Sequence, residues 1–293
     1  MVVVRIDGGL GNQMFQYAMY RYLMTIIPNE NVYMDIDCYN PHQSGNLTDY
    51  FSISPRQISQ PEKKRFNRNG MWHLLRVTDN IGITNACYYR ENTISDEAIE
   101  DIVKKRRVYL RGYWQKACYA LNVEKNLRQD FEFSGMLENV APEVREKNKK
   151  IIDEIDSSVS VAVHIRGGDY LEASESYGGI CTADYYSRAV KEIEKRVENP
   201  KFFIFTNDIE YMNSFSEVWQ GRDVRIADAN DEEHGHLDML LMSRCRHHVL
   251  ANSSFSYWGA WLGKNPEQIA ILPKRWDNER DSDELCNPGW IQI

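Results

Sequence analysis

The stretch 159–170, which reads Val-Ser-Val-Ala-Val-His-Ile-Arg-Gly-Gly-Asp-Tyr, joins an apolar run to groups that can bind an anion. The run predicts a buried strand that delivers polar groups at its carboxyl end. Because side chains alternate across a strand, His164 and Arg166 should share one face. The guanidinium of Arg166 offers paired donors to a phosphate or a carboxylate. The alternative is that Arg166 pairs with Asp169 across a turn and that His164 fills the core.

The second half of the chain alternates strand-like and helix-like segments, which predicts a doubly wound parallel α/β sheet. In such sheets ligands bind beyond the carboxyl ends of the strands. Every loop that follows a strand should therefore lie at the same edge as Arg166. The predicted strands are 159–166, 201–206, 223–227, 247–251 and 268–272, and the predicted helices between them are 183–197, 209–219, 236–245 and 255–264.

Three of these loops carry further polar groups that could meet a ligand at this edge. Asn207 directly follows the second of these strands. Ser253 and Ser254 precede a helix, where free backbone N–H groups face an anion, although capping by the hydroxyls is the simpler interpretation. Asp238 lies in the first turn of another helix and could accept two hydrogen bonds from a guanine edge. Its simpler role is to interact with the helix dipole.

The amino-terminal segment predicts a strand, a glycine-rich turn and a helix, at 2–6, 7–13 and 14–27. Gly9 and Gly11 would let the backbone approach a ligand closely. The turn lacks the third glycine of the dinucleotide-binding fingerprint, and it lacks the Gly-Lys-Ser/Thr of a P-loop. By itself it is weak evidence for a ligand.

Two groups of side chains could hold a metal, but simpler interpretations are favoured for both. Asp35 and Asp37 form an Asp-x-Asp pair at the end of a predicted strand, 31–36, and such acids are more often solvated or capping residues. His234 and His236 lie among acids, which is more typical of an exposed acidic loop. We therefore expect no metal site.

The rest of the first half shows less pattern, and the segment 40–85 supports no assignment. The charged segment 142–155 predicts a solvated helix. Its end marks the candidate boundary between two domains, 1–156 and 157–293. The other predicted elements are helices at 95–106 and 121–131 and a strand at 107–114.

Composition excludes several classes of protein. The 293 residues contain no apolar run near the roughly 18 residues that cross a bilayer. The net charge of −8 argues against a polyanion-binding surface, so nucleic acid is not an expected partner. The six cysteines show no Cys-x-x-Cys pair, which indicates reduced thiols. No signal peptide precedes the first strand, so we expect a cytoplasmic protein.

Four motifs in order resemble the bacterial branch of the α-1,2-fucosyltransferase family. They are the segments 8–18, 164–170, 205–208 and 251–262, which together span nearly the whole chain. The resemblance implies a GT-B type fold, in which two Rossmann-like doubly wound domains face a cleft. The first domain would bind the acceptor and the second the donor. It further implies transfer from GDP-L-fucose to a galactoside, with inversion at the anomeric carbon and without a metal or other cofactor.

The implied partners follow from this chemistry. They are GDP-L-fucose and a galactose-terminated oligosaccharide or glycolipid, with peripheral association with membrane-bound glycan intermediates at the inner face of the cytoplasmic membrane. The natural pathway would be the synthesis of a surface glycan such as O-antigen or capsule. Which glycan is the acceptor is left open.

The resemblance also assigns roles to residues. Arg166 matches the arginine that pairs with the donor diphosphate, and Asp238 resembles the acid that reads guanine. Asn12 lies where related enzymes place an amide between donor and acceptor. The implied catalytic residues are Arg166, Asn12 and Asp169, and the implied donor-binding residues are Gly9, Gly11, His164, Arg166, Asn207, Asp238, Ser253, Ser254 and Phe255.

One position departs from the family pattern His-x-Arg-Arg-x-Asp, because the second arginine is Gly167 here. The catalytic base is not identified by any motif. Asp169, Asp7 and Asp35 are the candidates, since a carboxylate can take the proton of the attacking hydroxyl.

Two other functions stay open. The first is a non-catalytic protein that binds a GDP-sugar or a glycan and has lost turnover through Gly167. The second is a dinucleotide oxidoreductase, which the missing third glycine disfavours.

Overall fold

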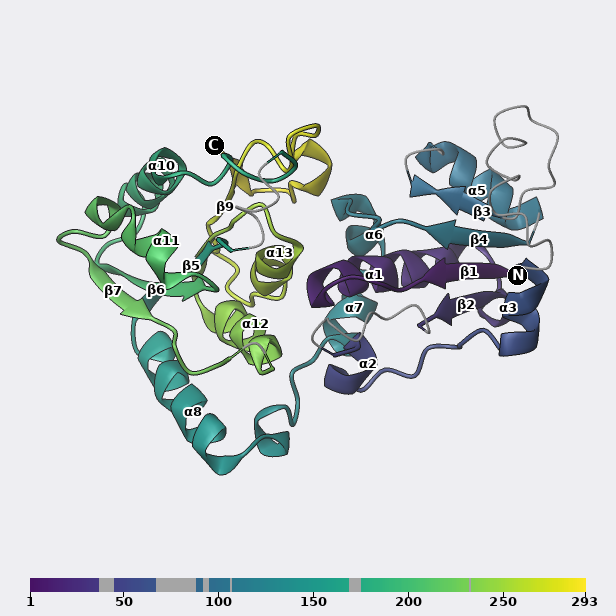
Figure 1. The fold of residues 1–293 in the computed structure, drawn as a ribbon, viewed down its shortest axis with the longest axis horizontal. Helices are drawn as coiled ribbons and strands as arrows, with labels where there is room; N and C mark the ends of the chain where they lie inside the picture. The colour runs from purple at the N-terminus through teal and green to yellow at the C-terminus, as the bar shows by residue number, and fades with distance from the viewer. Residues whose placement is uncertain (37–44, 67–87, 92–94, 106, 169–174, 232) are drawn as a thin grey trace. The chain divides into compact units, whose positions relative to one another are not determined.

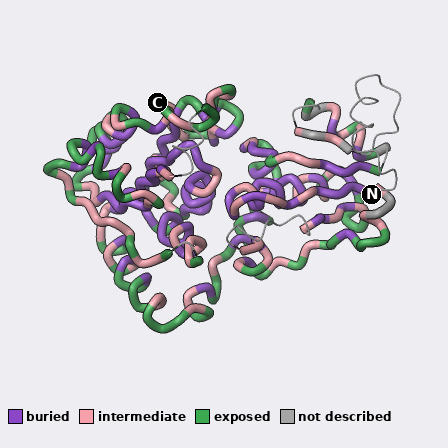
Figure 2. The backbone as a smooth tube through the Cα atoms, in the orientation of Figure 1, coloured by how far each residue is buried: buried purple, intermediate pink, exposed green. Residues whose placement is uncertain are grey.

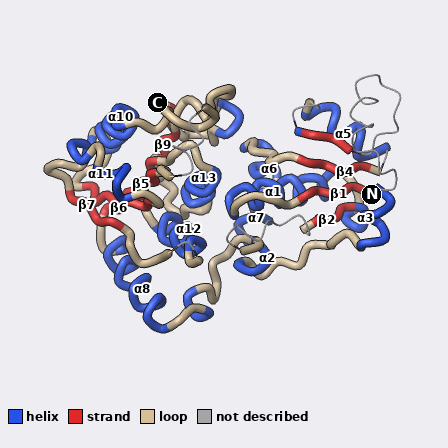
Figure 3. Tube along the Cα trace, viewed as in Figure 1, coloured by secondary structure: helices blue, strands red, loops and turns tan. Residues whose placement is uncertain are grey.

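The structure, a computed structural model, describes residues 1–293 except 37–44, 67–87, 92–94, 106, 169–174 and 232. Asp37, Asp169 and most of the segment 40–85 therefore lie outside the described residues. The chain divides into two compact units, Met1–Asp130 and Phe131–Ile293 (Figure 1). Each unit is a parallel sheet with helices packed on it (Figure 3).

The first unit has a four-stranded sheet in the order β2-β1-β4-β3. Strand β1 is fully buried from Val2 to Val4 and pairs in parallel with both β2 and β4. The strands are β1 (Val2–Arg5), β2 (Val32–Asp35), β3 (Tyr88–Arg90) and β4 (Val108–Arg111); the helices are α1 (Leu10–Ile26), α2 (Leu47–Tyr50), α3 (Gln60–Phe66), α5 (Asp96–Lys105), α6 (Ala117–Asn122) and α7 (Glu124–Asp130), with a 3₁₀ turn at Asn29–Asn31.

The second unit has a six-stranded parallel sheet in the order β10-β9-β8-β5-β6-β7. Read from β7, this is the strand order 3-2-1-4-5-6 of the Rossmann fold. The strands are β5 (Val159–Ile165), β6 (Pro200–Thr206), β7 (Asp223–Ile226), β8 (His247–Val249), β9 (Ala270–Leu272) and β10 (Ile291–Gln292); the helices are α8 (Pro142–Asp156), α10 (Ala183–Glu194), α11 (Ile209–Asn213), α12 (Gly235–Arg244) and α13 (Ser254–Trp261), with 3₁₀ turns at Leu137–Asn139, Ser216–Val218 and Asp283–Leu285.

Strand β5 lies in the buried part of the second unit (Figure 2). It separates two apolar layers, as its alternating side chains predict. Val161, Val163 and Ile165 pack with the aromatic side of α10. Ala162 packs on the opposite face with residues of α8 and α12. His164 has the same parity as Ala162 and therefore belongs to the second face.

The boundary between the units differs from the sequence prediction. The units divide after Asp130 rather than after Asp156, because α8 belongs to the second unit. Its apolar residues Ile151 and Ile155 are buried in the core with Phe203 of β6. The charged residues of α8 remain on its solvated face, so the helix is amphipathic and does not link two domains.

Several elements also differ in their limits. Helix α1 begins at Leu10 rather than at residue 14, because Gly9 already has extended backbone angles at the N-cap. Gly11 and Asn12 therefore lie in the first turn of a helix and not in a loop. The predicted helices 121–131 and 209–219 are each interrupted, and strands β3 and β10 were not predicted.

Among the described residues, no helix is long and apolar enough to span a bilayer.

Candidate active site

The carboxyl ends of β5 and β8 form the switch point of the second sheet. The chain leaves β5 towards β6 on one side, whereas β8 pairs with β5 on the other side. The connections that follow β5 and β8 therefore run in opposite directions along the sheet, and open α/β sheets bind ligands at such a point. Arg166 directly follows β5, and α13 begins shortly after β8. The rings of His164 and Phe255 lie 5.9 Å apart between their centroids, so the end of β5 lies beside the start of α13.

His164 is a buried, neutral imidazole at this switch point. The residue is 6% exposed. Burial, together with the charge of Arg166, lowers the pKa of His164 to about 3. Within the described part of the chain, its Nδ1 atom has no hydrogen-bond partner. A buried polar atom without a partner is costly, and a bound water or a ligand is one way to satisfy it. His164 therefore stays a candidate for ligand contact, and its role as a core residue stays open.

The loop that carries Arg166 is held by the loop after β6. The Gly167 N–H donates to Asn207 Oδ1 at 3.0 Å, and the Gly168 N–H donates to Asp208 Oδ2 at 3.0 Å. Asp208 also accepts the Tyr211 N–H at the start of α11. These bonds lower the pKa of Asp208 below its usual value, the bond from Tyr211 contributing most. Asn207 thus positions the loop.

Gly167 packs against Asp208 so closely that the family arginine does not fit beside it. A Cβ atom at position 167 would lie 2.6 Å from Asp208 Cβ. Asp208 cannot simply swing away, because its carboxylate holds two backbone N–H groups. The loss of the second arginine is therefore coupled to the position of Asp208.

We expect Gly167→Ala to destabilise the protein by about 1–3 kcal/mol, which is typical of an overpacked site. Urea denaturation measures this loss. The matched control is Gly235→Ala, where a Cβ atom meets nothing within 4 Å. In an Asp208→Ala background the Gly167→Ala loss should persist in part, since the Cβ contact remains while the Oδ2 contact is removed. Equal stability of Gly167→Ala and the parent would contradict the packing argument.

Helix α13 directs its first N–H groups towards the same edge. Ser253 is the N-cap, and its side-chain oxygen accepts the Phe255 N–H at 3.3 Å. At 5% exposure its hydroxyl serves the cap, as the simpler interpretation predicts. Ser254 is the first helical residue and is half-buried. The start of α13 thus offers a helix N-terminus beside His164, and such termini attract anions.

Asp238 lies in the first turn of α12 within a network of amides. Asn230 donates from Nδ2 to Asp238 Oδ1 at 2.8 Å. Asn230 and Asn148 of α8 also exchange two hydrogen bonds, of 2.7 and 3.0 Å. Burial raises the pKa of Asp238 to about 7 despite the Asn230 bond. Neither Asn148 nor Asn230 was predicted from the sequence, because the network joins residues far apart in the chain.

The first unit has a separate group of polar residues at the start of α1. Gly9 is the N-cap of α1, and a Cβ atom there would meet nothing within 4 Å. Gln115 donates from Nε2 to Asn12 Oδ1 at 2.8 Å, which fixes the orientation of the Asn12 amide. Gly11 lies in the same helical turn, directly before Asn12.

The candidate bases of the first unit are already engaged. Asp35 is 1% exposed and accepts hydrogen bonds from Lys63 at 2.8 Å and from the Tyr109 hydroxyl at 2.6 Å. It is therefore inaccessible to an acceptor hydroxyl. Asp7 pairs with Arg5 at 2.7 Å. Asp169, the third candidate, lies outside the described residues.

The histidines 234 and 236 form no metal cluster within the described residues. His234 Nδ1 lies 2.7 Å from Asp231 Oδ1, and the two histidine rings are 6.4 Å apart between centroids. In the part of the chain that the structure describes, no group of three or more histidine, cysteine or acidic side chains could hold a metal ion.

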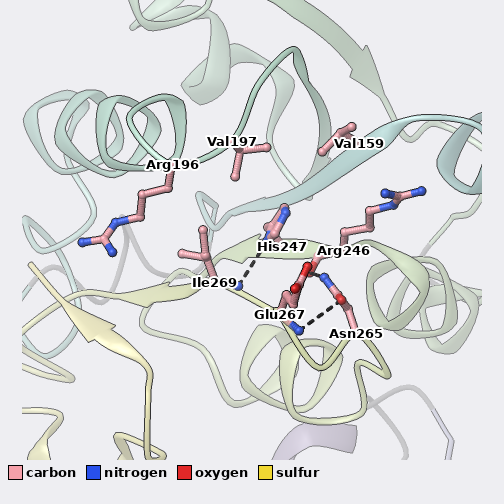
Figure 4. Close-up of a pocket in the computed structure, with 8 residues that line it drawn as sticks. All are labelled: Val159, Arg196, Val197, Arg246, His247, Asn265, Glu267 and Ile269. Atoms are coloured by element: carbon pink, nitrogen blue, oxygen red, sulfur yellow. Dashed lines mark hydrogen bonds between the residues drawn. The ribbon is translucent and has the colours of Figure 1, made fainter.

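A cavity of about 460 Å³ opens at the opposite edge of the second sheet, at the amino ends of β5 and β8 (Figure 4). Its polar groups largely bond within the protein, since the Ile269 N–H donates to His247 Nδ1 at 3.1 Å. Arg196 and Arg246 point away from one another and do not converge on a ligand. This cavity is therefore separate from the site at the carboxyl ends.

A model of the family described as glycosyl transferase family 11 matches residues 1–293. The chain belongs to this family. It is 31% identical over 302 residues to an alpha-1,2-colitosyltransferase of Escherichia coli, with 100% of this chain and 99% of the relative covered. It is 24% identical over 306 residues to the O-antigen biosynthesis glycosyltransferase WbnK of Escherichia coli, with 98% and 99% covered.

Solved structures of a fucosyltransferase show the same fold as this chain. The NodZ alpha-1,6-fucosyltransferase of Bradyrhizobium, co-crystallised with GDP, aligns with a TM-score of 0.53 at 14% identity. The alignment covers 92% of this chain and 94% of NodZ. This likeness and the two parallel sheets confirm the predicted GT-B type of fold for this member of glycosyl transferase family 11.

Proposed function

We propose that this family 11 member is an inverting galactoside α-1,2-L-fucosyltransferase that needs no metal. It transfers fucose from GDP-β-L-fucose to the 2-hydroxyl of a galactose in a glycan. The observation that carries the proposal is the switch point of the second sheet. There Arg166, the neutral His164 and the N-terminus of α13 come together. This set of groups suits a diphosphate, which combines high negative charge with many acceptor oxygens.

The proposed reaction is a single displacement. The galactose oxygen bonds to the anomeric carbon of fucose as the bond to the GDP phosphate oxygen breaks, so the β-linked donor yields an α-linked product. Negative charge grows on the departing diphosphate. Fixed donors aimed at that charge stabilise the transition state, and Arg166 with the first N–H groups of α13 supplies them. The proton of the hydroxyl passes to a base, for which Asp169 remains our candidate.

The two units have separate tasks in this proposal. Unit 131–293 binds the donor, with Asp238 on the guanine edge and Asn207 holding the Arg166 loop. Unit 1–130 binds the acceptor, with Asn12 orienting the reacting hydroxyl and Gly9 and Gly11 leaving room for the ligand. The O-antigen relative supports a glycan acceptor. In our proposal this acceptor is carried on a lipid at the inner face of the cytoplasmic membrane.

A second donor is favoured by one observation, the 31% identity to an alpha-1,2-colitosyltransferase. Colitose is L-fucose without its 3-hydroxyl, so GDP-colitose would present the same nucleotide and diphosphate. The two donors differ only in one hydrogen-bonding group on the sugar. Comparing kcat/KM for GDP-L-fucose and GDP-colitose therefore distinguishes the two transferases.

The test of the proposed function is GDP release from GDP-L-fucose with lactose or N-acetyllactosamine, in EDTA. We expect acceptor-dependent release, and an α-1,2-linked product by NMR. Tight donor binding without transfer to any galactoside would instead support the non-catalytic GDP-sugar-binding protein. Release that EDTA abolishes and Mn²⁺ restores would refute the metal-free mechanism.

A further inference from the structure

Two side chains at the carboxyl edge of the first sheet, Tyr113 and Glu91, have no role in the site described above. In the order β2-β1-β4-β3, the chain runs from β1 to β2 on one side and later returns to β3 and β4 on the other. The ends of β1 and β4 therefore form the switch point of this unit. The segment after β4, Tyr113 to Gln115, lies there beside Gly8 and Asn12.

The backbone after β4 exposes one aromatic ring and buries the next. Trp114 has a φ of +55°, a conformation that a residue with a side chain rarely adopts, and is 1% exposed. Tyr113, immediately before it, is 41% exposed. Its Cε1 atom lies next to Gly8, where a Cβ atom would come within 3.2 Å. Strained backbone persists where the surrounding structure imposes it, and it is common at ligand sites.

A carboxylate from a third segment lies beside this ring. Glu91 directly follows β3, and its Oε2 atom accepts the Tyr113 N–H at 2.8 Å. The approach requires Gly112, because a Cβ atom there would lie 2.5 Å from Glu91 Cβ. The oriented amide of Asn12, held by Gln115, is on the same edge. No sequence motif pointed to Glu91 or Gln115.

These groups have the chemistry of a sugar site. The apolar C–H face of a pyranose packs on an exposed aromatic ring, while its hydroxyls need planar donors and acceptors, which carboxylates and amides provide. We propose that Tyr113, Glu91 and the Gln115-oriented Asn12 form the subsite for the acceptor galactoside. Tyr113 is the stacking platform, Glu91 accepts a hydrogen bond from a sugar hydroxyl, and Gln115 is a positioning residue. This inference rests on the proposed function for the identity of the sugar.

Two substitutions at Tyr113 and one at Glu91 separate recognition from structure. Tyr113→Phe keeps the ring, whereas Tyr113→Ala removes it. Glu91→Gln keeps an oxygen that can accept the Tyr113 N–H, so it preserves the anchoring of the loop while it removes the charge. Leu121→Ala is the matched control, because Leu121 is an exposed apolar residue of the same unit at 38%.

The readout is direct binding of lactose in the presence of GDP, by saturation-transfer NMR and calorimetry. We expect Tyr113→Ala and Glu91→Gln to weaken lactose binding about tenfold or more, while Tyr113→Phe and Leu121→Ala stay near the parent. The Kd for GDP should be unchanged in all four variants. In turnover assays the KM for lactose should rise and the KM for GDP-L-fucose should not.

The subsite and the proposed function fail in different ways. Lactose affinity that is unaltered in both Tyr113→Ala and Glu91→Gln overturns the subsite, even if the parent transfers fucose. The same holds if the parent chain with GDP binds no galactoside. Lactose binding that depends on both residues, in a chain that never releases GDP, supports the subsite and overturns the transferase. If Glu91→Gln alone is neutral, Glu91 only anchors the loop.

Discussion

Replacing Arg166 by alanine is expected to lower kcat for fucose transfer by about 10²–10³-fold, the usual cost of removing one preorganised donor from a developing charge. Arg166 directly follows β5 and is close enough to His164 for its charge to lower the pKa of that imidazole. The substitution removes the one cation that the motif places at the diphosphate. The KM for the acceptor should change little, because the acceptor is bound by the other unit in our proposal.

Two further variants make this prediction specific. Arg166→Lys keeps the charge but loses the paired donors of the guanidinium, so it should recover only part of the rate. Arg188→Ala is the control, because Arg188 is an exposed arginine of the same unit that pairs with Asp184 on the surface of α10. Initial rates of GDP release give kcat for each protein, and melting temperatures report folding. A kcat for Arg166→Ala equal to that of Arg188→Ala would contradict the role of Arg166.

The affinity for GDP is expected to fall as the pH drops below about 7, because Asp238 must be ionised to accept two N–H groups of guanine. Burial raises the pKa of this carboxyl to about 7. A ligand that binds only the ionised form loses about tenfold in affinity per pH unit below the pKa. The pKa of His164, at about 3, and that of His236, at about 4, keep both imidazoles neutral over this range.

Calorimetric titrations of GDP between pH 5.5 and 8.5 measure this effect. The phosphates of GDP titrate in the same range, so the comparison with Asp238→Asn is essential. That variant keeps the phosphate contribution but presents an amide N–H to guanine. It should bind GDP about 10–100-fold more weakly at pH 8. It should also lose the part of the pH dependence of GDP affinity that comes from the contact between Asp238 and guanine. Parallel pH profiles for the two proteins would rule out Asp238 as the group that reads guanine.

The amide network offers a second variant for the same experiment. The hydrogen bond from Asn230 lowers the pKa of Asp238, although burial has the larger, opposite effect. Asn230→Ala should therefore move the midpoint of the GDP affinity profile to higher pH. Asn213→Ala, at an exposed position of α11, should leave the midpoint in place. A merely structural role of Asn230 would lower stability without moving the midpoint.

The same raised pKa has a consequence for stability without ligand. A carboxyl whose pKa is higher in the folded state favours folding below its unfolded pKa of about 4. That contribution is lost as the pH rises towards 7. GDP, which favours the ionised form, should therefore raise the melting temperature more at pH 8 than at pH 6. If GDP raised the melting temperature of the parent chain equally at both pH values, this would argue against a contact between ionised Asp238 and the guanine base.

Local sequence patterns determined most of the strands and the chemistry at their ends. The alternation along β5 predicted that Ala162 and His164 lie on one face of the strand and Val163 on the other. The structure confirms that Val163 and Ala162 pack on different faces. The order of strands and helices predicted the parallel sheet of the second unit, and the family resemblance implied a sheet in the first. The motifs predicted the family that the family model confirms. These features depend on contacts between near neighbours in the chain or on short spacings, which a sequence displays directly.

Only the tertiary structure decided how distant segments combine. The close approach of Gly167 and Asp208, the burial of Asp35 and the Asn148–Asn230–Asp238 network each join residues from different strands or helices. Glu91 reaches Tyr113 because β3 and β4 are neighbours, and β3 itself had no visible pattern. The boundary between the units lies before α8 rather than after it, because α8 buries Ile151 and Ile155 against a sheet whose strands come later in the chain. Hydrogen bonds and packing across such separations are set by the fold, and no local spacing of residue types records them.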